Sequence, residues 1–157
     1  MALVKTVTVP NDGRQSETAQ LVVRGVRRLL RASGLASVVE LPLVSGRRAD
    51  VVALAPDGSI LIVEVKSSAA DFRSDRKWPE YRLHCDRFYF AFPANLDAGM
   101  FPDDAGLIAA DAYGAEYLRE APVHRISGAG RRALILRFGL AAADRLHNAV
   151  DPDALRF

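Results

Sequence analysis

The sequence predicts one α/β domain over residues 1–157, with a mixed central sheet flanked by helices. Three observations predict this class. A helical apolar period opens the chain, three short apolar runs typical of strands follow, and a second helical segment leads into the uninterrupted apolar run 88–92. A strand that is apolar at every position is typical of the centre of a sheet, and of parallel pairing. Half of the residues are hydrophobic and a quarter are charged, as in ordinary globular domains.

The first predicted element is a helix that runs to about Ser33. Residues 1–14 are expected to be loosely structured, with a turn at 10–13. Ser16 and Glu17 are a typical helix start, and Gly34 is a typical stop. A stripe of arginines on this helix is typical of a solvated face; the alternative is a surface that follows a nucleic-acid backbone. The apolar face consists of Val22, Val26, Leu29 and Leu30, and the stripe consists of Arg24, Arg27, Arg28 and Arg31.

Three strands are predicted next, at 38–43, 49–54 and 60–66, and the last two form a hairpin. Pro56 suits the second position of a type I turn, and Gly58 suits the left-handed position that follows. These residues predict a three-residue hairpin loop with a bulge at the glycine.

The hairpin loop determines which side chains face each other. Ala55 pairs with Ser59, and counting outward places Asp50 opposite Glu64, with their Cβ atoms about 4.5–5.5 Å apart. A two-residue loop would shift the register by one and send the two acids to opposite faces. Lys66 follows on the same face as Glu64, because side chains alternate along a strand. The hairpin therefore predicts two adjacent carboxylates with a lysine one step along.

The remaining elements complete the order helix, three strands, helix, strand. Pro79 is expected to open the second helix, since proline is tolerated in a first turn but not deep inside a helix. The further predictions are a helix within 72–85, strands at 88–92, 107–110 and 133–138, a turn between strands at 127–130, and a last helix at 140–150.

Two carboxylates side by side on an apolar strand indicate a cation site. Like charges directly opposite each other are destabilising, and a divalent cation between them removes that cost. Mg²⁺, with Mn²⁺ as a substitute, suits two carboxylates plus a substrate phosphate because it keeps several waters. The metal would lower the pKa of a bound water, while Lys66 orients that water or stabilises charge on the phosphate. The alternative is a surface ion pair between Lys66 and one of the acids, Asp50 or Glu64.

Two sets of residues resemble known families. Asp50 followed by Glu64-Val65-Lys66 resembles the PD-(D/E)XK nuclease signature, in which the proline before the first acid is often absent, as it is here at Ala49. A longer set resembles the MmcB-type bacterial DNA repair family, from the first helix to about residue 116. The resemblance implies a restriction-endonuclease-like fold with an αβββαβ core and a role in DNA repair, but not cleavage by itself. That set consists of the runs 63–68, 71–73, 75–81 and 85–91.

The resemblance also points to further metal ligands. In many nucleases of this fold an acid on the first helix adds a ligand, and Glu17 is the acid on this helix. The alternative explanation for Glu17 is that an acid in the first turn interacts favourably with the helix dipole. Glu40 is a second candidate, because an acid on a short apolar strand needs a partner. The carbonyl of Val65 is a candidate backbone ligand.

The segment after Lys66 is expected to face the substrate. Ser67 and Ser68 offer hydroxyls to phosphate. Basic residues next to Trp78 and Tyr81 suit a nucleic-acid strand whose bases stack; the alternative is that both rings pack onto the sheet as core. The predicted DNA contacts are Arg48, Ser67, Ser68, Arg73, Arg76, Lys77, Trp78 and Tyr81.

Several classes of protein do not fit the sequence. A single cysteine, Cys85, rules out an internal disulfide and fits a reducing cytoplasm. No secretion signal, membrane span, P-loop or histidine–cysteine cluster is evident. The net charge of +2 is a weak argument for nucleic acid.

Three functions remain. The first is a Mg²⁺-dependent DNA nuclease of repair that releases the 3′-oxygen, with Asp50, Glu64 and Lys66 as catalytic residues. The second is a non-cleaving DNA-binding or scaffold factor that recruits other repair proteins, and the third is a small-molecule or tRNA-directed enzyme. Paired cuts would need a homodimer, but no dimer signature is evident, so the oligomeric state stays open.

Overall fold

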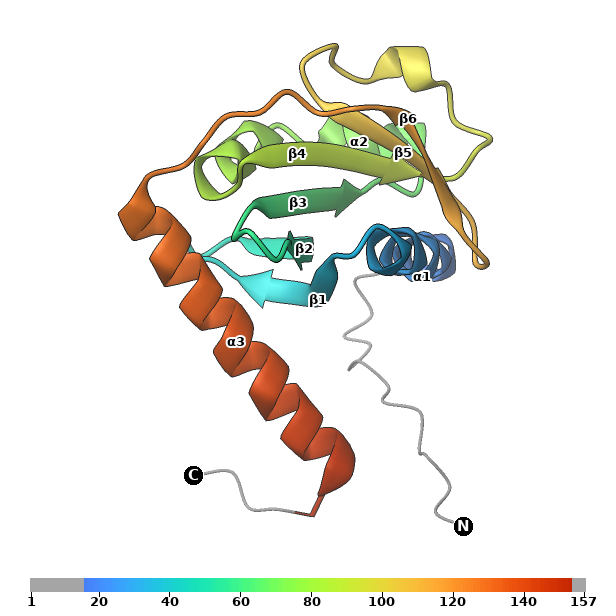
Figure 1. Ribbon diagram of the computed structural model, residues 1–157. Helices are drawn as coiled ribbons and strands as arrows, with labels where there is room; N and C mark the ends of the chain where they lie inside the picture. Colours follow the sequence, from blue (N-terminus) through green and yellow to red (C-terminus); the bar gives the residue numbers. More distant parts are fainter. Residues whose placement is uncertain (1–15, 154–157) are drawn as a thin grey trace.

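A computed structural model describes residues 16–153, which form a six-stranded mixed sheet with helices on both faces (Figure 1). The strands lie in sequence order across the sheet, and the predicted loose segment 1–14 lies outside the described residues. No helix within 16–153 combines the length and apolarity that crossing a bilayer needs. The elements are α1 (Glu17–Ala32), β1 (Ala36–Pro42), β2 (Arg48–Leu54), β3 (Ile60–Val65), α2 (Ala69–Ser74), the 3₁₀ helix η1 (Trp78–His84), β4 (Arg87–Phe92), the 3₁₀ helix η2 (Ala98–Met100), β5 (Gly106–Ala110), β6 (Ala115–Arg119) and α3 (Gly128–Val150).

Helix α1 forms as predicted. The Ser16 hydroxyl accepts a hydrogen bond from the backbone N–H of Ala19 and so caps the first turn. The chain leaves the helix through Gly34, whose φ of 81° is in the left-handed region. Val22 and Val26 on its inner face are buried against the sheet.

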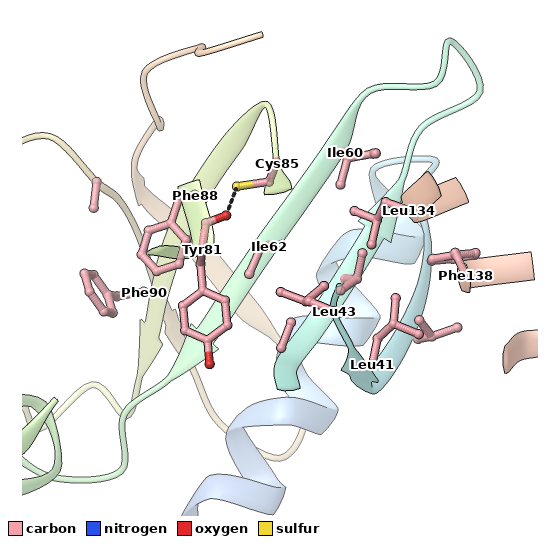
Figure 2. Packing of buried hydrophobic residues seen from close by; sticks show 14 of the residues in the cluster. Leu41, Leu43, Ile60, Ile62, Tyr81, Cys85, Phe88, Phe90, Leu134 and Phe138 are labelled. Atoms are coloured by element: carbon pink, nitrogen blue, oxygen red, sulfur yellow. Dashed lines mark hydrogen bonds between the residues drawn. The ribbon is translucent and has the colours of Figure 1, made fainter. Parts of the chain in front are cut away.

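The sheet has one apolar layer on each face, because its strands alternate their side chains. Val51, Val63 and Tyr89 pack with α1 on one face. Ile62 and Phe90 point to the other face, in one cluster with Tyr81 of η1 and with Leu134 and Phe138 of the first half of α3 (Figure 2). Strand β4 is central and runs parallel to both β3 and β5, so the prediction from its continuous apolar run is confirmed.

The hairpin has the predicted loop and register. Ala55 N–H donates to the carbonyl of Ser59 at 2.9 Å, and Gly58 adopts a φ of 89°. Val51 pairs with Val63 at the end of the ladder, in the register that places Asp50 opposite Glu64. Turn chemistry alone was therefore sufficient to predict which residues face each other.

The C-terminal third differs from the prediction. The predicted strand 133–138 and the predicted turn 127–130 are both wrong, because α3 begins at Gly128 and includes them. The Ser127 hydroxyl accepts from the N–H of Gly130 and caps this helix. A short apolar run fits a buried strand and a helix equally well, and here Leu134 and Phe138, four residues apart, bury one helical face.

Strand β6 was not predicted. It pairs antiparallel with β5 and forms one edge of the sheet. Glu116 and Leu118 are exposed, and the residues that alternate with them, Ala115, Tyr117 and Arg119, are half-buried. An edge strand with one solvated face has no continuous apolar run, so its sequence resembles a loop.

Gly25 is required where α1 packs against the β5–β6 connection. A Cβ at this position would lie 2.1 Å from the carbonyl oxygen of Asp111 and 2.4 Å from that of Gly114. We expect Gly25→Ala to lower the free energy of unfolding by about 3 kcal/mol, since backbone cannot move aside cheaply. Gly139→Ala, in α3, has no atom within 4 Å and should instead raise stability by up to about 1 kcal/mol. Urea unfolding of both variants checks this, and equal stabilities would contradict the packing.

Candidate metal and nucleic-acid site

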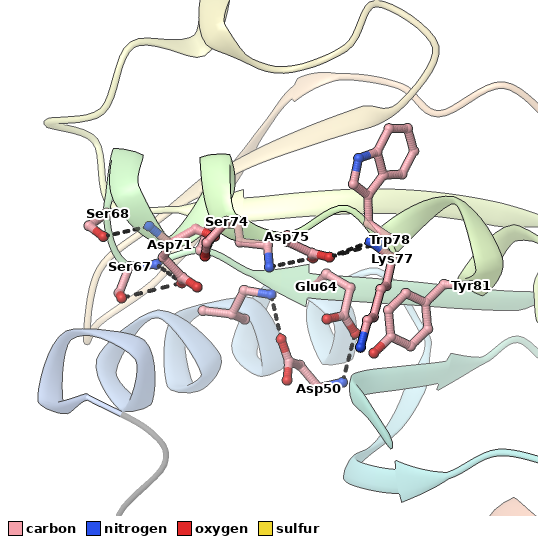
Figure 3. A network of polar contacts seen from close by, with 12 residues as sticks. Asp50, Glu64, Ser67, Ser68, Asp71, Ser74, Asp75, Lys77, Trp78 and Tyr81 are labelled. Atoms are coloured by element: carbon pink, nitrogen blue, oxygen red, sulfur yellow. Dashed lines mark hydrogen bonds and ion pairs between the residues drawn. The ribbon is translucent and has the colours of Figure 1, made fainter. Parts of the chain in front are cut away.

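The candidate site lies where β2 and β3 part. The backbone ladder between these strands ends at the pair Val51 and Val63. Beyond it, the strands are linked by hydrogen bonds from backbone N–H groups to the carboxylates of Asp50 and Glu64. One oxygen of the Glu64 carboxylate accepts from the backbone N–H of Asp50 at 3.0 Å, and one oxygen of Asp50 accepts from the N–H of Val65 at 2.8 Å. The two acids thus lie across from each other and close together, as the loop predicts (Figure 3).

The Glu64 side chain is buried and Asp50 is half-buried, and the two carboxylates disturb each other electrostatically. Glu64 is only 4 % exposed; burial and then the charge of Asp50 hold its pKa well above the ordinary value. Burial also raises the pKa of Asp50, and this effect outweighs the hydrogen bond from Val65 N–H, which lowers the pKa. Two like charges in contact and largely shielded from water favour either a shared proton or a cation beside them.

Lys66 lies next to the acids and is held by a third one. Its Nζ is 2.6 Å from Oδ2 of Asp75, and both side chains are largely buried. Burial lowers the pKa of Lys66, but the hydrogen bond and charge of Asp75 outweigh burial, so the net shift is upward. The ammonium group therefore stays charged at neutral pH. Strand β3 ends at Val65, one residue earlier than predicted.

The role of Asp75 was not predicted from the sequence. Besides holding Lys66, its carboxylate accepts from the backbone N–H groups of Lys77 and Trp78, at 2.9 and 3.2 Å. One side chain thus links the lysine to the turn that begins η1. The only signal in the sequence was an aspartate before a helical turn, which predicts a cap but no partner.

The two serines after Lys66 serve the local fold. The hydroxyl of Ser68 accepts from the N–H of Asp71 and caps α2. The Asp71 carboxylate accepts from the backbone N–H of Ser67 at 3.0 Å and from its hydroxyl at 3.4 Å. Both hydroxyls therefore already have partners, and a phosphate would have to share them.

In the part of the chain that the structure describes, residues 16–153, the carboxylates of Glu17 and Glu40 form no metal-binding group with the acid pair, although Glu40 lies across from Asp50 between the paired residues of β1 and β2. Glu17 is exposed in the first turn of α1, which packs on the face of the sheet opposite to Ile62 and Phe90, the neighbours of Glu64. Glu40 has a φ of 48°, and its carboxylate lies 3.7 Å from the guanidinium of Arg48.

The donor set fits a hard cation that keeps most of its waters. Among residues 16–153, no three side chains of the His, Cys, Asp and Glu types form a group that could hold a metal ion. Asp50 and Glu64 offer two carboxylates with excess negative charge. Mg²⁺ accepts such a small protein ligand set when water and phosphate complete its shell.

The aromatic rings of Trp78 and Tyr81 belong to the core. Tyr81 is buried, and its hydroxyl donates to the carbonyl of Arg48 at 3.1 Å. Trp78 stacks on Phe88 at 5.7 Å between ring centroids, and the guanidinium of Arg82 covers it at 4.8 Å. The structure therefore supports the core alternative for both rings and corrects the expectation that they stack on bases.

The basic residues of this segment remain at the surface. Arg73, Arg76 and Lys77 are exposed, and the last two directly follow Asp75, the partner of Lys66. Arg48 is also exposed and adjoins Asp50 in sequence. Positive charge on these side chains would attract a polyanion toward the acid pair.

Comparison with known proteins gives two matches. The profile of the family described as "DNA repair protein MmcB-like" matches residues 7–153. A solved structure, the "SPO1766 protein of unknown function from Silicibacter pomeroyi", is similar with a TM-score of 0.87 and 41% identity, over 91% of this chain and 98% of that one. The search of curated proteins finds no match.

Proposed function

Because the chain belongs to the MmcB-like DNA repair protein family, we propose that it is a Mg²⁺-dependent nuclease that hydrolyses phosphodiester bonds in DNA. The observation that carries this proposal is the pairing of buried Glu64 with half-buried Asp50, with a charged lysine beside them. Two carboxylates held together in apolar surroundings destabilise the fold, and such an arrangement is typical of a functional site, here one that binds a cation. On this reading the core is of the PD-(D/E)XK, restriction-endonuclease-like type.

Each residue has a distinct role in the proposed reaction. Asp50 and Glu64 would hold the cation, with the Val65 carbonyl as a third oxygen. The bound metal would supply a more acidic water and offset negative charge on the phosphate. Lys66 would orient the attacking water or stabilise charge on the phosphate, and the leaving group is the 3′-oxygen. Asp75 positions the lysine.

The proposed partner is DNA, held by exposed cations around the site. Arg48, Arg73, Arg76 and Lys77 would contact phosphates, which would make binding strongly dependent on salt. Other repair proteins are the further proposed partners, and the proposed location is the cytoplasm, where Cys85 stays reduced.

A second function has two observations in its favour. Lys66 is already paired with Asp75, and only two acids converge at the site within the described residues. An inactive member of the same family, serving as a DNA-binding scaffold for other repair factors, would tolerate both features.

Cleavage assays separate the two functions. Labelled single-stranded, duplex, flap and crosslinked DNA would be incubated with Mg²⁺ or Mn²⁺ and sampled over time. We expect metal-dependent cutting by the wild type and a loss of about 100-fold or more in Lys66→Ala. Arg125→Ala, which removes an exposed cation of the β6–α3 connection, should cut normally. Binding without cutting of any substrate would contradict the nuclease and favour the scaffold.

A further inference from the structure

The outer face of α3 is unusually apolar for a solvated helix. Of its 23 residues, only Leu134 and Phe138 are buried. Leu136, Leu140 and Val150 are 54 %, 68 % and 78 % exposed. Figure 1 shows the C-terminal half of the helix continuing past β1 and beyond the sheet. Large apolar side chains gathered on one exposed face mark an interaction surface more often than a solvated one.

These side chains form one continuous stripe. Leu136, Leu140, Ala143, His147 and Val150 are spaced alternately by four and three residues, which is the a/d spacing of a two-helix seam. The stripe lies opposite the face that contacts the domain, because Leu134, Phe138 and the β1-binding Arg145 repeat on the other side of the helix. We call the five residues of the stripe the α3 seam.

The charges beside the α3 seam identify its partner. Exposed Arg132 and Arg137 lie in the N-terminal half of the helix, exposed Asp144 lies in its C-terminal half, and exposed Asp151 is its C-cap. Arg137 and Asp144 are two turns apart and so share one flank of the seam. Within the chain both make only long hydrogen bonds: Arg137 donates to the Pro42 carbonyl at 3.5 Å, and Asp144 accepts from the Asn148 amide at 3.4 Å.

The charges of one α3 helix complement those of a second α3 helix that runs in the opposite direction. Two copies of α3 packed antiparallel about Leu140 would set Arg137 of each copy beside Asp144 of the other, twice. A parallel pair would set like charges against each other. Antiparallel packing also opposes the two helix dipoles favourably.

We propose that the α3 seam pairs with the α3 seam of a second copy, in an antiparallel homodimer with two-fold symmetry. The contact is isologous, so it closes on itself and leaves no further copy to add. Ala143, next to Leu140 in the seam, is small and allows the two helices to approach closely at the centre. The inference does not depend on the proposed nuclease function, and would give the protein two symmetry-related sites.

The first test is the mass in solution by sedimentation equilibrium. The wild type, a 17.1 kDa chain, should sediment at twice that mass at concentrations up to about 100 µM. Leu136→Glu combined with Leu140→Glu should be a monomer at the same concentrations, with unchanged circular dichroism, because both residues are exposed. Leu83→Glu, at a site 75 % exposed elsewhere, should remain dimeric. A monomeric wild type, or a dimer that survives the double variant, would overturn the proposal.

The second test is disulfide crosslinking, which reports the direction of the helices. In an antiparallel pair centred near residue 140, Leu140→Cys lies beside its own copy and should crosslink on oxidation. Val150→Cys should not, because roughly 28 Å would separate the two copies. Cys85 is buried and does not interfere. Crosslinking at both positions would indicate a parallel pair, and crosslinking at neither would remove the seam as the interface; either result overturns the proposal.

Discussion

Glu64→Gln is expected to abolish metal-dependent DNA cutting, by about 100-fold or more, and to raise the melting temperature of the metal-free protein. The glutamine side-chain oxygen can still accept from the N–H of Asp50, so the local geometry is kept while one of the two adjacent charges is removed. Relief of the repulsion should stabilise the fold by about 1 kcal/mol at neutral pH. Loss of activity together with gain of stability is the pattern of a functional charge rather than a structural one.

Thermal melting with and without Mg²⁺ or Mn²⁺ measures metal binding by Asp50 and Glu64 in the absence of DNA. A ligand that binds only the folded state raises its stability, by about 2.7 kcal/mol at a hundredfold excess over the Kd. We expect this rise in the wild type and its loss in Glu64→Gln. The control is Glu116→Gln, an exposed strand acid, which should respond to metal as the wild type does. An equal rise in all three proteins would show that the metal binds elsewhere.

The pH dependence of the metal-free protein follows from the same groups. The folded-state pKa of Glu64 lies well above 4.5, so between 4.5 and that pKa the folded state holds a proton that the unfolded state has released. Stability should therefore fall as pH rises through this interval. In Glu64→Gln this contribution is absent, and melting at a series of pH values compares the two proteins. A wild-type stability that rises through the interval exactly as the variant does would contradict the burial of the charge.

Asp86→Ala is expected to lower the free energy of unfolding by about 3–5 kcal/mol, the largest effect on stability that we predict. Its buried carboxylate binds both terminal nitrogens of Arg131, at 2.5 and 2.7 Å. It also accepts from the backbone N–H groups of Ile60 and Ile126, at 2.8 and 3.2 Å. Without it, a partly buried guanidinium and a buried N–H lose their acceptor at the place where β3, β4 and α3 begin.

Urea unfolding at several pH values tests this role. Burial raises the pKa of Asp86, but the hydrogen bonds from Arg131 and from the two N–H groups outweigh burial and lower it to about 2. Because this folded pKa is below the unfolded value of 3.8, the stabilisation is present above 3.8 and is lost as pH falls toward 2. Asp103→Ala, at an exposed acid, should change little. A loss below about 1 kcal/mol in Asp86→Ala would contradict the network.

The sequence by itself determined the features that depend on neighbours along the chain. The loop residues Pro56 and Gly58 set the hairpin register, and the register placed Asp50 opposite Glu64. The apolar run 88–92 was sufficient to place β4 at the centre of the sheet. Turn conformation and side-chain period act over a few residues, so they are legible without knowing the rest of the fold.

Only the tertiary structure decided the features that depend on distant segments. Asp75 became the partner of Lys66, and Asp86 the partner of Arg131 45 residues later, through the way the chain returns on itself. The same packing buried the ring of Tyr81 and made a helix of the apolar run 133–138. A buried position accepts the same residue types in a strand, in a helix or beside a ligand, and the surroundings that distinguish these cases come from segments far away in the sequence.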